Sequence, residues 1–547
     1  MSTWLHELTI DSDKDFILDG IHNGFKVMNI PDNLPSAECN NYKSATCATN
    51  RPLVEKQLKS ELRAGHYKIC RQKPQIISAI GAIPKPDSSD IRIIHDCSRP
   101  INTGINAYAN PEKFSFETID SALSLAPYHA WMAKIDIKSA YRHVALHPSQ
   151  YPATGIKFKF TGDDKYTYMY DTRLMFGASE SVGVFHRITQ SIVRMMRRKG
   201  FHSTICYLDD FLIMEKTYDR CKLAMDTLQQ LLIRLGFTLN YNKCVQPTQR
   251  LTFLGIDIDM VQQMLFIPPA KLNSIRDSTL QALSWNKATK RQLQSLVGLI
   301  SWGAKCVKAI RPILRSLIDL QSPLKHPSHR IRLPAFVKMD LAYFHNWCVK
   351  FNGVSFAQRF QPNTVVWTDS SPEAGAAYSS DKDFLYHSWS ADFPGIMSQP
   401  IYIKELAAVL LAFHRWAPLW HNKSVHIHTD NQATKWAIRK GLSKNVVANA
   451  LLKELLWIAA MFNISVNVSY ITSKNNVIAD ALSRMHDSRF LTNLISLLWD
   501  QDINIASPYY NLLFHMSHAS YVFLQSKWLC HPPLQLSGVK RPNWTNP

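Results

Sequence analysis

Two adjacent carboxylates, Asp209 and Asp210, lie in the middle of an otherwise apolar stretch, STICYLDDFLIM (residues 203–214). Apolar runs on both sides predict a β-hairpin that carries both carboxylates at its tip. Adjacent carboxylates repel each other unless a cation binds between them, and Mg²⁺ prefers carboxylate oxygens. We therefore expect a metal site at this hairpin, with an exposed acidic turn as the structural alternative.

A third carboxylate, Asp136, ends an apolar strand in WMAKIDIKSAYRHVALHP (residues 131–148), five positions before Tyr141. Together with Asp209 it would complete a two-metal site. Such a site suits in-line displacement at a phosphate, because one ion activates the attacking oxygen and the other stabilises the leaving group. Taken alone, an Asp at the end of a strand is more often a cap or turn residue.

Four further acids follow in the C-terminal half, in the order strand, helix, strand, helix. They occur in NTVVWTDSS, IYIKELAAVLLAFHRWA, SVHIHTDNQAT and NNVIADALSR, and they are Asp369, Glu405, Asp430 and Asp480. Strand ends and helix starts gather at one edge of an α/β sheet, so the four carboxylates could converge there. Two metals and phosphodiester cleavage are the economical interpretation, although each acid alone could be a solvated surface residue.

The whole chain has the size and charge of a multidomain nucleic-acid-binding protein. Its 547 residues exceed one core and suggest about three to five structural units. The net charge of +20 favours a polyanionic partner. The ten cysteines show no zinc spacing and indicate reduced thiols, and we find no secretory signal or membrane span. We therefore expect an intracellular protein, in the cytoplasm or nucleus, that is not secreted.

The hydrophobic patterns predict an α+β region, a helical region and a second α/β unit. Pro268 and Pro269 open the first helix of the helical region, and Thr289 caps the second. The stretch SPLKHPSHRIRLP (322–334) is typical of a linker. The expected segments are an N-terminal extension (1–60), the first α+β region (61–260), the helices (261–325), a connection (326–360), the second α/β unit (361–486) and a tail of unknown role (487–547).

These segments resemble the reverse transcriptase family over about residues 60–485. YLDD resembles the YxDD signature, and the surrounding motifs arrive in the family's order: IPKPDSSDIRIIHDCSRPIN, KIDIKSAYRHV, RLMFGASESVGVFHRI, LGFTLNYNKC and FLGIDID. The resemblance implies a right-hand polymerase of fingers, palm and thumb. DIKSAYRHVALHP, the stretch MDLAYFHNWCVKFNGVSF and the lack of a protease motif are similar to tyrosine-recombinase (DIRS-like) retrotransposons.

The resemblance also implies roles for individual residues. Asp136 and Asp209 would bind both metals with Asp210 beside them, and Lys85 and Arg92 would contact the triphosphate. Positive charge around a transferring phosphate stabilises its oxygens.

Four more residues match the nucleotide pocket of the family. Tyr141 matches the aromatic gate under the sugar, which excludes a 2′-hydroxyl and so favours dNTPs. Phe176 and Gly177 match the start of the nucleotide-pocket motif. Lys243 matches a lysine near the pyrophosphate, with an exposed loop lysine as the alternative.

One part of the polymerase region departs from the family's motifs, and the role of another part stays open. Met175 replaces the usual proline, and Ser179-Glu180-Ser181 stands near the usual small-Ala-Pro segment, which puts the template grip in doubt. Downstream, a basic cluster ends a helical pattern and could contact template phosphates or form a solvated helix end. Its members are Arg194, Arg197, Arg198 and Lys199.

TDSS, KEL, TDNQA and ADALSR resemble the ribonuclease H family in its retroelement form. The resemblance implies an α/β ribonuclease H-like domain whose catalytic and metal-binding acids are the four carboxylates named above. Tyr470 stands where many relatives carry a His, so the cleavage rate and metal dependence are open.

The combined prediction is an RNA-directed DNA polymerase with ribonuclease H activity. We expect two Mg²⁺ ions per active site, with Mn²⁺ as a substitute, and RNA template, DNA primer, RNA–DNA hybrid and dNTPs as partners. The oligomeric state stays unknown. Three alternatives remain: a non-enzymatic binding remnant of a transposon, an RNA-dependent RNA polymerase, and a bifunctional enzyme with its own integration activity, for which we see no signature.

Overall fold

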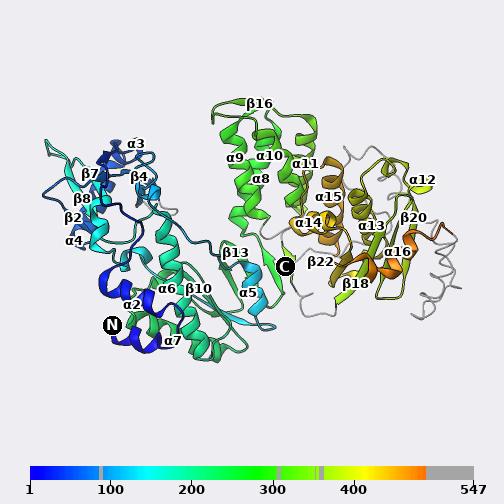
Figure 1. The fold of residues 1–547 in the computed structure, drawn as a ribbon, viewed down its shortest axis with the longest axis horizontal. Helices are drawn as coiled ribbons and strands as arrows, with labels where there is room; N and C mark the ends of the chain where they lie inside the picture. The colour runs from blue at the N-terminus through cyan, green and yellow to red at the C-terminus, as the bar shows by residue number, and fades with distance from the viewer. Residues whose placement is uncertain (85–89, 305–309, 351–352, 357–362, 488–547) are drawn as a thin grey trace. The chain divides into compact units, whose positions relative to one another are not determined.

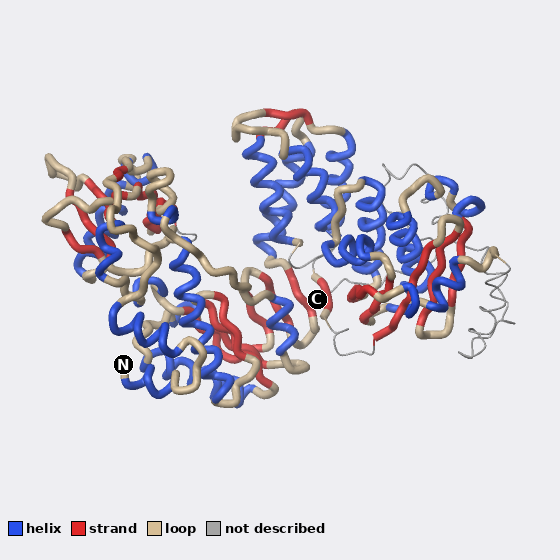
Figure 2. The backbone as a smooth tube through the Cα atoms, viewed as in Figure 1, coloured by secondary structure: helices blue, strands red, loops and turns tan. Residues whose placement is uncertain are grey.

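The computed structural model describes residues 1–84, 90–304, 310–350, 353–356 and 363–487. The chain divides into two compact units, residues 1–254 and 255–547. Each unit has its own sheets and helices (Figures 1 and 2). The predicted tail beyond Asp487 lies outside the described residues.

A four-stranded antiparallel sheet forms the centre of the first unit, in the order β11-β6-β10-β9. The strands are β6 (Trp131–Asp136), β9 (Thr204–Tyr207), β10 (Asp210–Glu215) and β11 (Val245–Thr248), and the helices packed on them are α6 (Ser179–Arg198) and α7 (Tyr218–Arg234). Because side chains alternate along a strand, Ile135, Phe211 and Ile213 share the face that joins the core with both helices. This sheet corresponds to the predicted palm.

A second sheet in the first unit is mixed and has the order β1-β3-β7-β8-β2. Its strands are β1 (Ala37–Glu38), β2 (Tyr67–Ile69), β3 (Ile76–Ile77), β7 (Gly155–Phe158) and β8 (Thr167–Asp171). A separate hairpin, β4 (Ala79–Pro84) and β5 (Ile91–Asp96), packs with α3 (Lys43–Thr46) and α4 (Arg51–Arg63). The short elements are α5 (Ile119–Leu125), η1 (Ile105–Ala107), η2 (Ala140–His143), η3 (Pro148–Ala153), η4 (Tyr241–Lys243) and β12 (Arg250–Phe253).

The N-terminal segment is part of the first unit's core and not a peripheral arm. It begins with α1 (Ser2–Glu7) and α2 (Lys14–Asn23). Trp4, Leu8 and Ile17 are buried in the same cluster as the residues of α6 and α7. The indole Nε1 of Trp4 donates a buried hydrogen bond to the carbonyl of Leu235 at 3.1 Å. The sequence predicts only an extension here, because the partner of Trp4 lies 231 positions away and no local pattern indicates it.

Helices dominate the first part of the second unit. They are α8 (Pro269–Leu283), α9 (Lys290–Gly303), α10 (Arg311–Gln321) and α11 (Ala335–Lys350), beside a small antiparallel sheet of β13 (Ile256–Asp259), β14 (Met264–Phe266) and β17 (Val354–Ser355). The predicted helix starts are confirmed, since Pro268 and Thr289 are the N-caps of α8 and α9. Thr289 and Gln292 form a capping box.

The predicted linker at 322–334 contains a strand. In Figure 1, β16 (Arg330–Arg332) lies at the far end of the helices, where it pairs with β15 (Lys287–Thr289). Lys287 stands opposite Arg332, so the ladder places like charges side by side. The Pro/His-rich composition suggested a linker because a strand this short has no readable alternation.

The second part of this unit is a five-stranded mixed sheet with the order β20-β19-β18-β21-β22. The strands are β18 (Asn363–Ser370), β19 (Ala374–Ser379), β20 (Phe384–Ser388), β21 (Ser424–Thr429) and β22 (Ser465–Tyr470). The helices are α12 (Trp389–Asp392), α13 (Ile401–Trp416), α14 (Gln432–Lys440), α15 (Val446–Met461) and α16 (Val477–Ser483), with η7 (Pro394–Ile396), η8 (Ala417–Trp420) and η9 (Ser473–Asn475). Helices α13 and α15 share a core with one face of the sheet, while α16 packs with residues of the opposite face (Figure 2).

Two general features concern the whole described chain. The eight cysteines among the described residues are free thiols. Within the described ranges, no helix is long and apolar enough to cross a membrane.

Candidate active sites

The hairpin of β9 and β10 carries the first pair of carboxylates. Tyr207 pairs with Asp210 across the two strands, so Leu208 and Asp209 form the turn. Leu208 has a φ of +54°, the left-handed conformation that tight hairpin turns require. The predicted hairpin with both carboxylates at its tip is therefore confirmed.

Asp136 lies at the end of β6, directly opposite Asp210 in the antiparallel ladder. The amide of Ile137 donates to the carbonyl of Asp209 at 3.1 Å, which ties the strand end to the turn. Three acids thus meet at one end of the sheet. Like charges directly opposite each other destabilise a ladder, so this arrangement calls for positive charge.

Two lysines supply part of that charge. Lys134 Nζ lies 3.2 Å from Asp210 Oδ1, and Lys243 Nζ lies 3.6 Å from Asp136 Oδ2. Burial raises the pKa of Asp209, and the neighbouring Asp210 raises it further. Burial also raises the pKa of Asp210, against the opposing effect of Lys134. A set of oxygen donors that is costly to ionise together suits a divalent cation, which would offset the repulsion.

Aromatic side chains border this site. The ring of Tyr141 is stacked on Phe176, with 4.9 Å between centroids and 26° between planes. The guanidinium of Arg92 lies 5.5 Å from the centre of the Phe176 ring. Burial, with a contribution from Asp209, raises the pKa of Tyr141 to about 12, so its hydroxyl stays neutral. The structure brings Arg92, Tyr141 and Phe176 together, whereas Lys85 lies outside the described residues.

Gly177 occupies a position that no other residue fits without strain. Its φ is +121°, and a Cβ there would lie 2.1 Å from the carbonyl oxygen of His95 on β5. The amide of His95 also donates to the carbonyl of Phe176 at 3.2 Å. The close approach holds the Phe176–Gly177 turn against the β4–β5 hairpin.

The basic cluster at the end of α6 pairs with the N-terminal segment. Arg194 Nη2 lies 2.6 Å from Asp11 Oδ1 and 2.8 Å from Asp13 Oδ2. Arg198 pairs with Asp11 at 3.4 Å, and Lys199 pairs with Glu7 at 2.7 Å. Arg194, Arg198 and Lys199 are therefore held by carboxylates of the same unit, which is neither a freely solvated helix end nor a set of cations left over for template phosphates.

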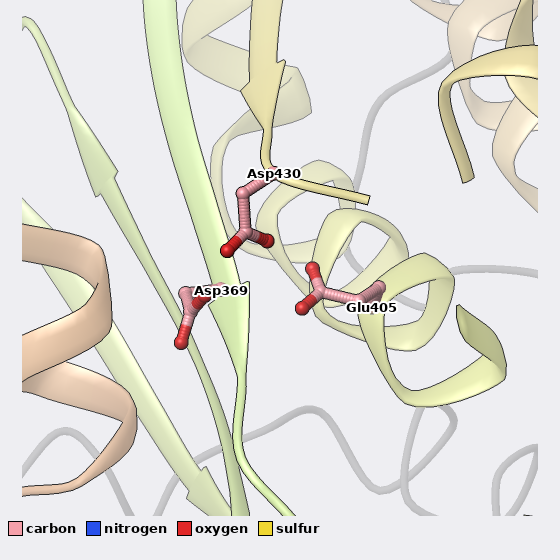
Figure 3. A group of neighbouring side chains, drawn as sticks. All are labelled: Asp369, Glu405 and Asp430. Atoms are coloured by element: carbon pink, nitrogen blue, oxygen red, sulfur yellow. The ribbon is translucent and has the colours of Figure 1, made fainter. Parts of the chain in front are cut away.

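The second site is a triad of acids. The ligand oxygens of Asp369, Glu405 and Asp430 all lie within 4.8 Å of one another, and in the part of the chain that the structure describes no other group of three acids, histidines or cysteines is this tight. Asp369 is on β18, Asp430 follows β21 and Glu405 is on α13. Because β18 and β21 are parallel neighbours, their carboxyl ends share one edge. Figure 3 shows Asp430 and Glu405 turned toward the space beside Asp369.

Hydrogen bonds hold each member of the triad. Ser483 donates to Asp369 Oδ2 at 2.6 Å, and Ser473 donates to Asp430 Oδ2 at 2.6 Å. The amide of Ser370 donates to Glu405 Oε1 at 3.1 Å. The other oxygen of Glu405, Oε2, is buried and has no hydrogen-bond partner among the described residues. A buried acceptor without a partner is costly, and a bound cation would satisfy it.

The triad is electrostatically strained without a cation. Burial raises the pKa of Asp369 to about 6; the Ser483 hydrogen bond opposes this, and the charges of Asp430 and Asp480 add to it. Burial, followed by the charges of Asp369 and Asp430, raises the pKa of Glu405 well above its ordinary value. These carboxylates fit a divalent metal by donor type, burial and spacing.

Asp480, the fourth predicted acid, is outside the triad. It lies on α16, where its Oδ1 is 2.9 Å from Arg484 Nη2 one turn further along. Its charge still acts on Asp369, so it borders the site. The four acids do occur in the predicted order of strand, helix, strand and helix, but the ion pair with Arg484 was not predicted.

Lys134 and Ser483 were missed by sequence reasoning. Lys134 is two positions before Asp136 and therefore on the same face of β6, a period-2 signal that could have identified it. Ser483 follows Asp480 by three positions, one helical turn, within the ADALSR motif. Its contact with Asp369 joins residues 114 positions apart, and no local pattern indicates it.

Comparison with known proteins agrees with this geometry. Residues 83–258 match the family model for reverse transcriptase (RNA-dependent DNA polymerase). The chain is 23% identical over 396 residues to the putative enzymatic polyprotein of Cassava vein mosaic virus, covering 70% of this chain and 57% of that protein. It is 21% identical over 420 residues to the retrovirus-related Pol polyprotein from transposon opus of Drosophila melanogaster, covering 74% and 38%. The chain thus spans less than two thirds of the length of these relatives.

Solved structures give the same fold. The foamy viral protease-reverse transcriptase dRH in complex with ds DNA has a TM-score of 0.51 and 14% identity, covering 86% of this chain and 81% of that one. The foamy viral protease-reverse transcriptase in complex with RNA/DNA hybrid has a TM-score of 0.50 and 14% identity, covering 86% and 62%. The predicted fold class, a right-hand polymerase followed by a ribonuclease H-like domain, is confirmed. Residues 83–258 are therefore a reverse transcriptase domain of the type found in retroelements and pararetroviruses.

Proposed function

We propose that the chain is an RNA-directed DNA polymerase that also cleaves the RNA strand of RNA–DNA hybrids. The observation that carries the proposal is the presence of two separate carboxylate sites, one in each compact unit. The first lies within the reverse transcriptase match, and the second lies at the edge of a five-stranded mixed sheet, which supports a ribonuclease H-like domain. Each site offers oxygen donors that need a cation, as two-metal phosphoryl chemistry requires.

At the first site, Asp136 and Asp209 would hold the metal ions, with Asp210 beside them. Bound Mg²⁺ would supply an activated primer 3′-hydroxyl and a stabilised pyrophosphate leaving group. Lys243, already beside Asp136, would balance charge on the leaving pyrophosphate. Lys134 would keep Asp210 oriented through its 3.2 Å contact.

The nucleotide would lie against the aromatic pair beside these acids. Tyr141 would pack under the sugar and exclude a 2′-hydroxyl, and Phe176 and Gly177 would form the adjoining wall. Arg92, over the Phe176 ring, would contact the triphosphate together with Lys85.

At the second site, Asp369, Glu405 and Asp430 would hold the metal ions for hydrolysis, with Asp480 at the border. Bound Mg²⁺ would supply a nucleophilic water and stabilise the leaving oxygen. Ser483 and Ser473 would keep Asp369 and Asp430 in place through their 2.6 Å hydrogen bonds.

Template, primer and hybrid are the proposed partners. The similar foamy viral protein has been solved in complex with RNA/DNA hybrid and, as its dRH form, with ds DNA. The net charge of +20 supports binding to a polyanion, and such binding should weaken as salt rises. We further propose service in retrotransposon replication, in an element of the tyrosine-recombinase (DIRS-like) type.

The decisive experiment uses an RNA template with an annealed DNA primer, Mg²⁺ and dNTPs, with both strands labelled. Wild-type protein should extend the primer and shorten the template. Asp209→Asn should stop extension and keep cleavage, whereas Asp369→Asn should keep extension and leave the template intact. Asp226→Asn, a change at an exposed acid of α7 outside both sites, is the matched control.

Other outcomes would favour the alternatives. Folded protein that binds hybrid but neither extends nor cleaves would favour the non-enzymatic remnant. Preference for rNTPs over dNTPs would favour an RNA-dependent RNA polymerase. Extension that survives Asp209→Asn would contradict the assigned polymerase site.

A further inference from the structure

A buried ion cluster is built around the residue that follows Tyr141 of the aromatic pair. At its centre is Arg142, the residue after Tyr141, whose side chain is only 9% exposed. Arg142 Nη1 donates to both carboxylate oxygens of Asp171, at 3.0 and 2.8 Å, and Nε donates to Glu61 Oε2 at 3.0 Å. Glu61 also contacts His66 Nδ1 at 2.8 Å. The guanidinium thus uses its fork on two carboxylates from different elements.

The cluster joins three elements of the first unit, one of which carries Tyr141. Glu61 is on α4, Asp171 ends β8, and Arg142 is in η2. Arg142 Nη1 also lies 3.4 Å from the carbonyl oxygen of Leu174, two residues before Phe176. A single side chain therefore touches the chain on both sides of the Tyr141–Phe176 stack.

A second path leads from Arg142 to the same stack. The guanidinium lies 5.1 Å from the centre of the Tyr67 ring. The Tyr67 hydroxyl lies 2.8 Å from His95 Nε2, and the two rings are stacked at 5.8 Å. His95 in turn bonds the carbonyl of Phe176 through its amide and approaches Gly177 too closely for a Cβ. The first path ends on Leu174, and the second ends on the Phe176–Gly177 turn.

A buried ion cluster is a weak source of stability. Taking the charges out of water costs several kcal/mol per ion, and apolar replacements of similar volume are often as stable. In addition, the planar guanidinium fixes the relative orientation of the two carboxylates, because its donors point in set directions. At this position the fork ties η2, which carries Tyr141, to α4, to the end of β8 and to the segment just before Phe176.

We propose that Arg142 is a positioning residue that sets the Tyr141–Phe176 stack and thereby the dNTP affinity and sugar selectivity of the polymerase site. The inference rests on the proposed function. Arg142 itself is buried and would not touch the nucleotide. A small displacement of the stack would weaken the fit to a deoxyribose and relax the exclusion of a 2′-hydroxyl, since reactivity is sensitive to displacements of about 1 Å.

The test compares Arg142→Lys with a neutral triple variant, Glu61→Gln with Arg142→Met and Asp171→Asn. Lysine keeps the charge and loses the fork, while the triple variant removes every charge and so avoids an unpaired buried carboxylate. Arg194→Lys is the matched control, because Arg194 makes a similar fork to Asp11 but lies in α6, where its acid partners come from the N-terminal segment. The readouts are thermal unfolding, hybrid affinity, kcat and KM for dNTP, dNTP binding to the protein–hybrid complex, and rNTP incorporation relative to dNTP.

Both Arg142 variants should raise the KM for dNTP by about tenfold and increase relative rNTP incorporation by a similar factor, with kcat and hybrid affinity within about twofold of wild type. Arg194→Lys should change thermal unfolding alone. A folded triple variant with wild-type KM and sugar selectivity would overturn the inference, as would parallel losses in KM, kcat and hybrid binding. Wild-type protein that binds hybrid but neither binds dNTP nor extends would instead overturn the proposed function and this inference with it.

Discussion

Replacing Asp369 by Asn should stabilise the second unit in the absence of metal while abolishing RNA cleavage. Asp369 is 3% exposed, and its pKa is raised from 3.8 to about 6 by burial and neighbouring acids. Because of this rise in pKa, ionising Asp369 at pH 8 costs about 3 kcal/mol of folding stability. The Asn side chain still accepts the hydrogen bond from Ser483, but a bond to a neutral acceptor is weaker than one to a carboxylate, by about 1 kcal/mol. The expected net gain is therefore about 2 kcal/mol.

The pH dependence follows from the direction of the shift. An acid whose pKa is raised in the folded state is penalised only where it ionises, so the penalty is absent below pH 3.8 and complete above about pH 6. At pH 5 about half of the penalty remains, so the advantage of Asp369→Asn should shrink by about 1.5 kcal/mol between pH 8 and pH 5. Added Mg²⁺ should stabilise the wild type and leave the variant unchanged, because a ligand stabilises the state that binds it.

Hydrogen exchange on peptides from β18 and α13 measures these local opening free energies in the full chain, with EDTA or Mg²⁺ and with correction for intrinsic rates. Asp392→Asn, a change at an acid of the same unit outside the triad, should alter protection by less than about 0.5 kcal/mol. Faster exchange in Asp369→Asn than in wild type at pH 8 in EDTA would refute the reasoning. An advantage that is equal at pH 8 and pH 5 would refute the electrostatic cause.

Three further outcomes are expected. Gly177→Ala should lower dNTP affinity in primer-extension kinetics and leave RNA cleavage intact, because its Cβ would meet the His95 carbonyl at 2.1 Å; unchanged kinetics would contradict the assigned turn. Asp11→Asn should lower the thermal stability of the first unit by about 2 kcal/mol, because Arg194 and Arg198 lose a buried carboxylate; an unshifted transition would contradict this. Charge reversal of Lys287 and Arg332 together should weaken hybrid binding. The slope of log affinity against log salt concentration should become shallower by about one for each lost phosphate contact. An unchanged slope would show that β15 and β16 do not contact the nucleic acid.

Sequence patterns predicted the features that depend on neighbours in the chain. The YLDD hairpin, the strand-ending Asp136 and the caps of α8 and α9 follow from alternation and capping chemistry, and the structure has them all. Asp369, Glu405 and Asp430 were predicted to converge because carboxyl ends of strands share an edge, and they do.

The features that were not predicted depend on distant partners. The cations of α6 have short-range signals only for a helix end, yet Arg194 meets Asp11 across 183 positions. Asp480 is the exception, because its ion pair with Arg484 is local and follows from i,i+4 spacing on a helix. Arg142 attracted no notice because an arginine after a strand has no pattern, and its partners Glu61 and Asp171 lie 81 and 29 positions away.

The place of α1 in the core has a consequence for the order in which the chain folds. Trp4 meets the carbonyl of Leu235 across 231 positions. A ribosome makes the chain from the N-terminus at about 5–20 residues per second, so α1 must wait on the order of tens of seconds before its partner exists. During that time Trp4 and Leu8 are exposed apolar side chains that a holdase chaperone could bind. Helix α1 is thus made before the rest of this unit but is among the last of its elements to reach its native contacts, and folding of the unit should depend on chain length up to the end of α7.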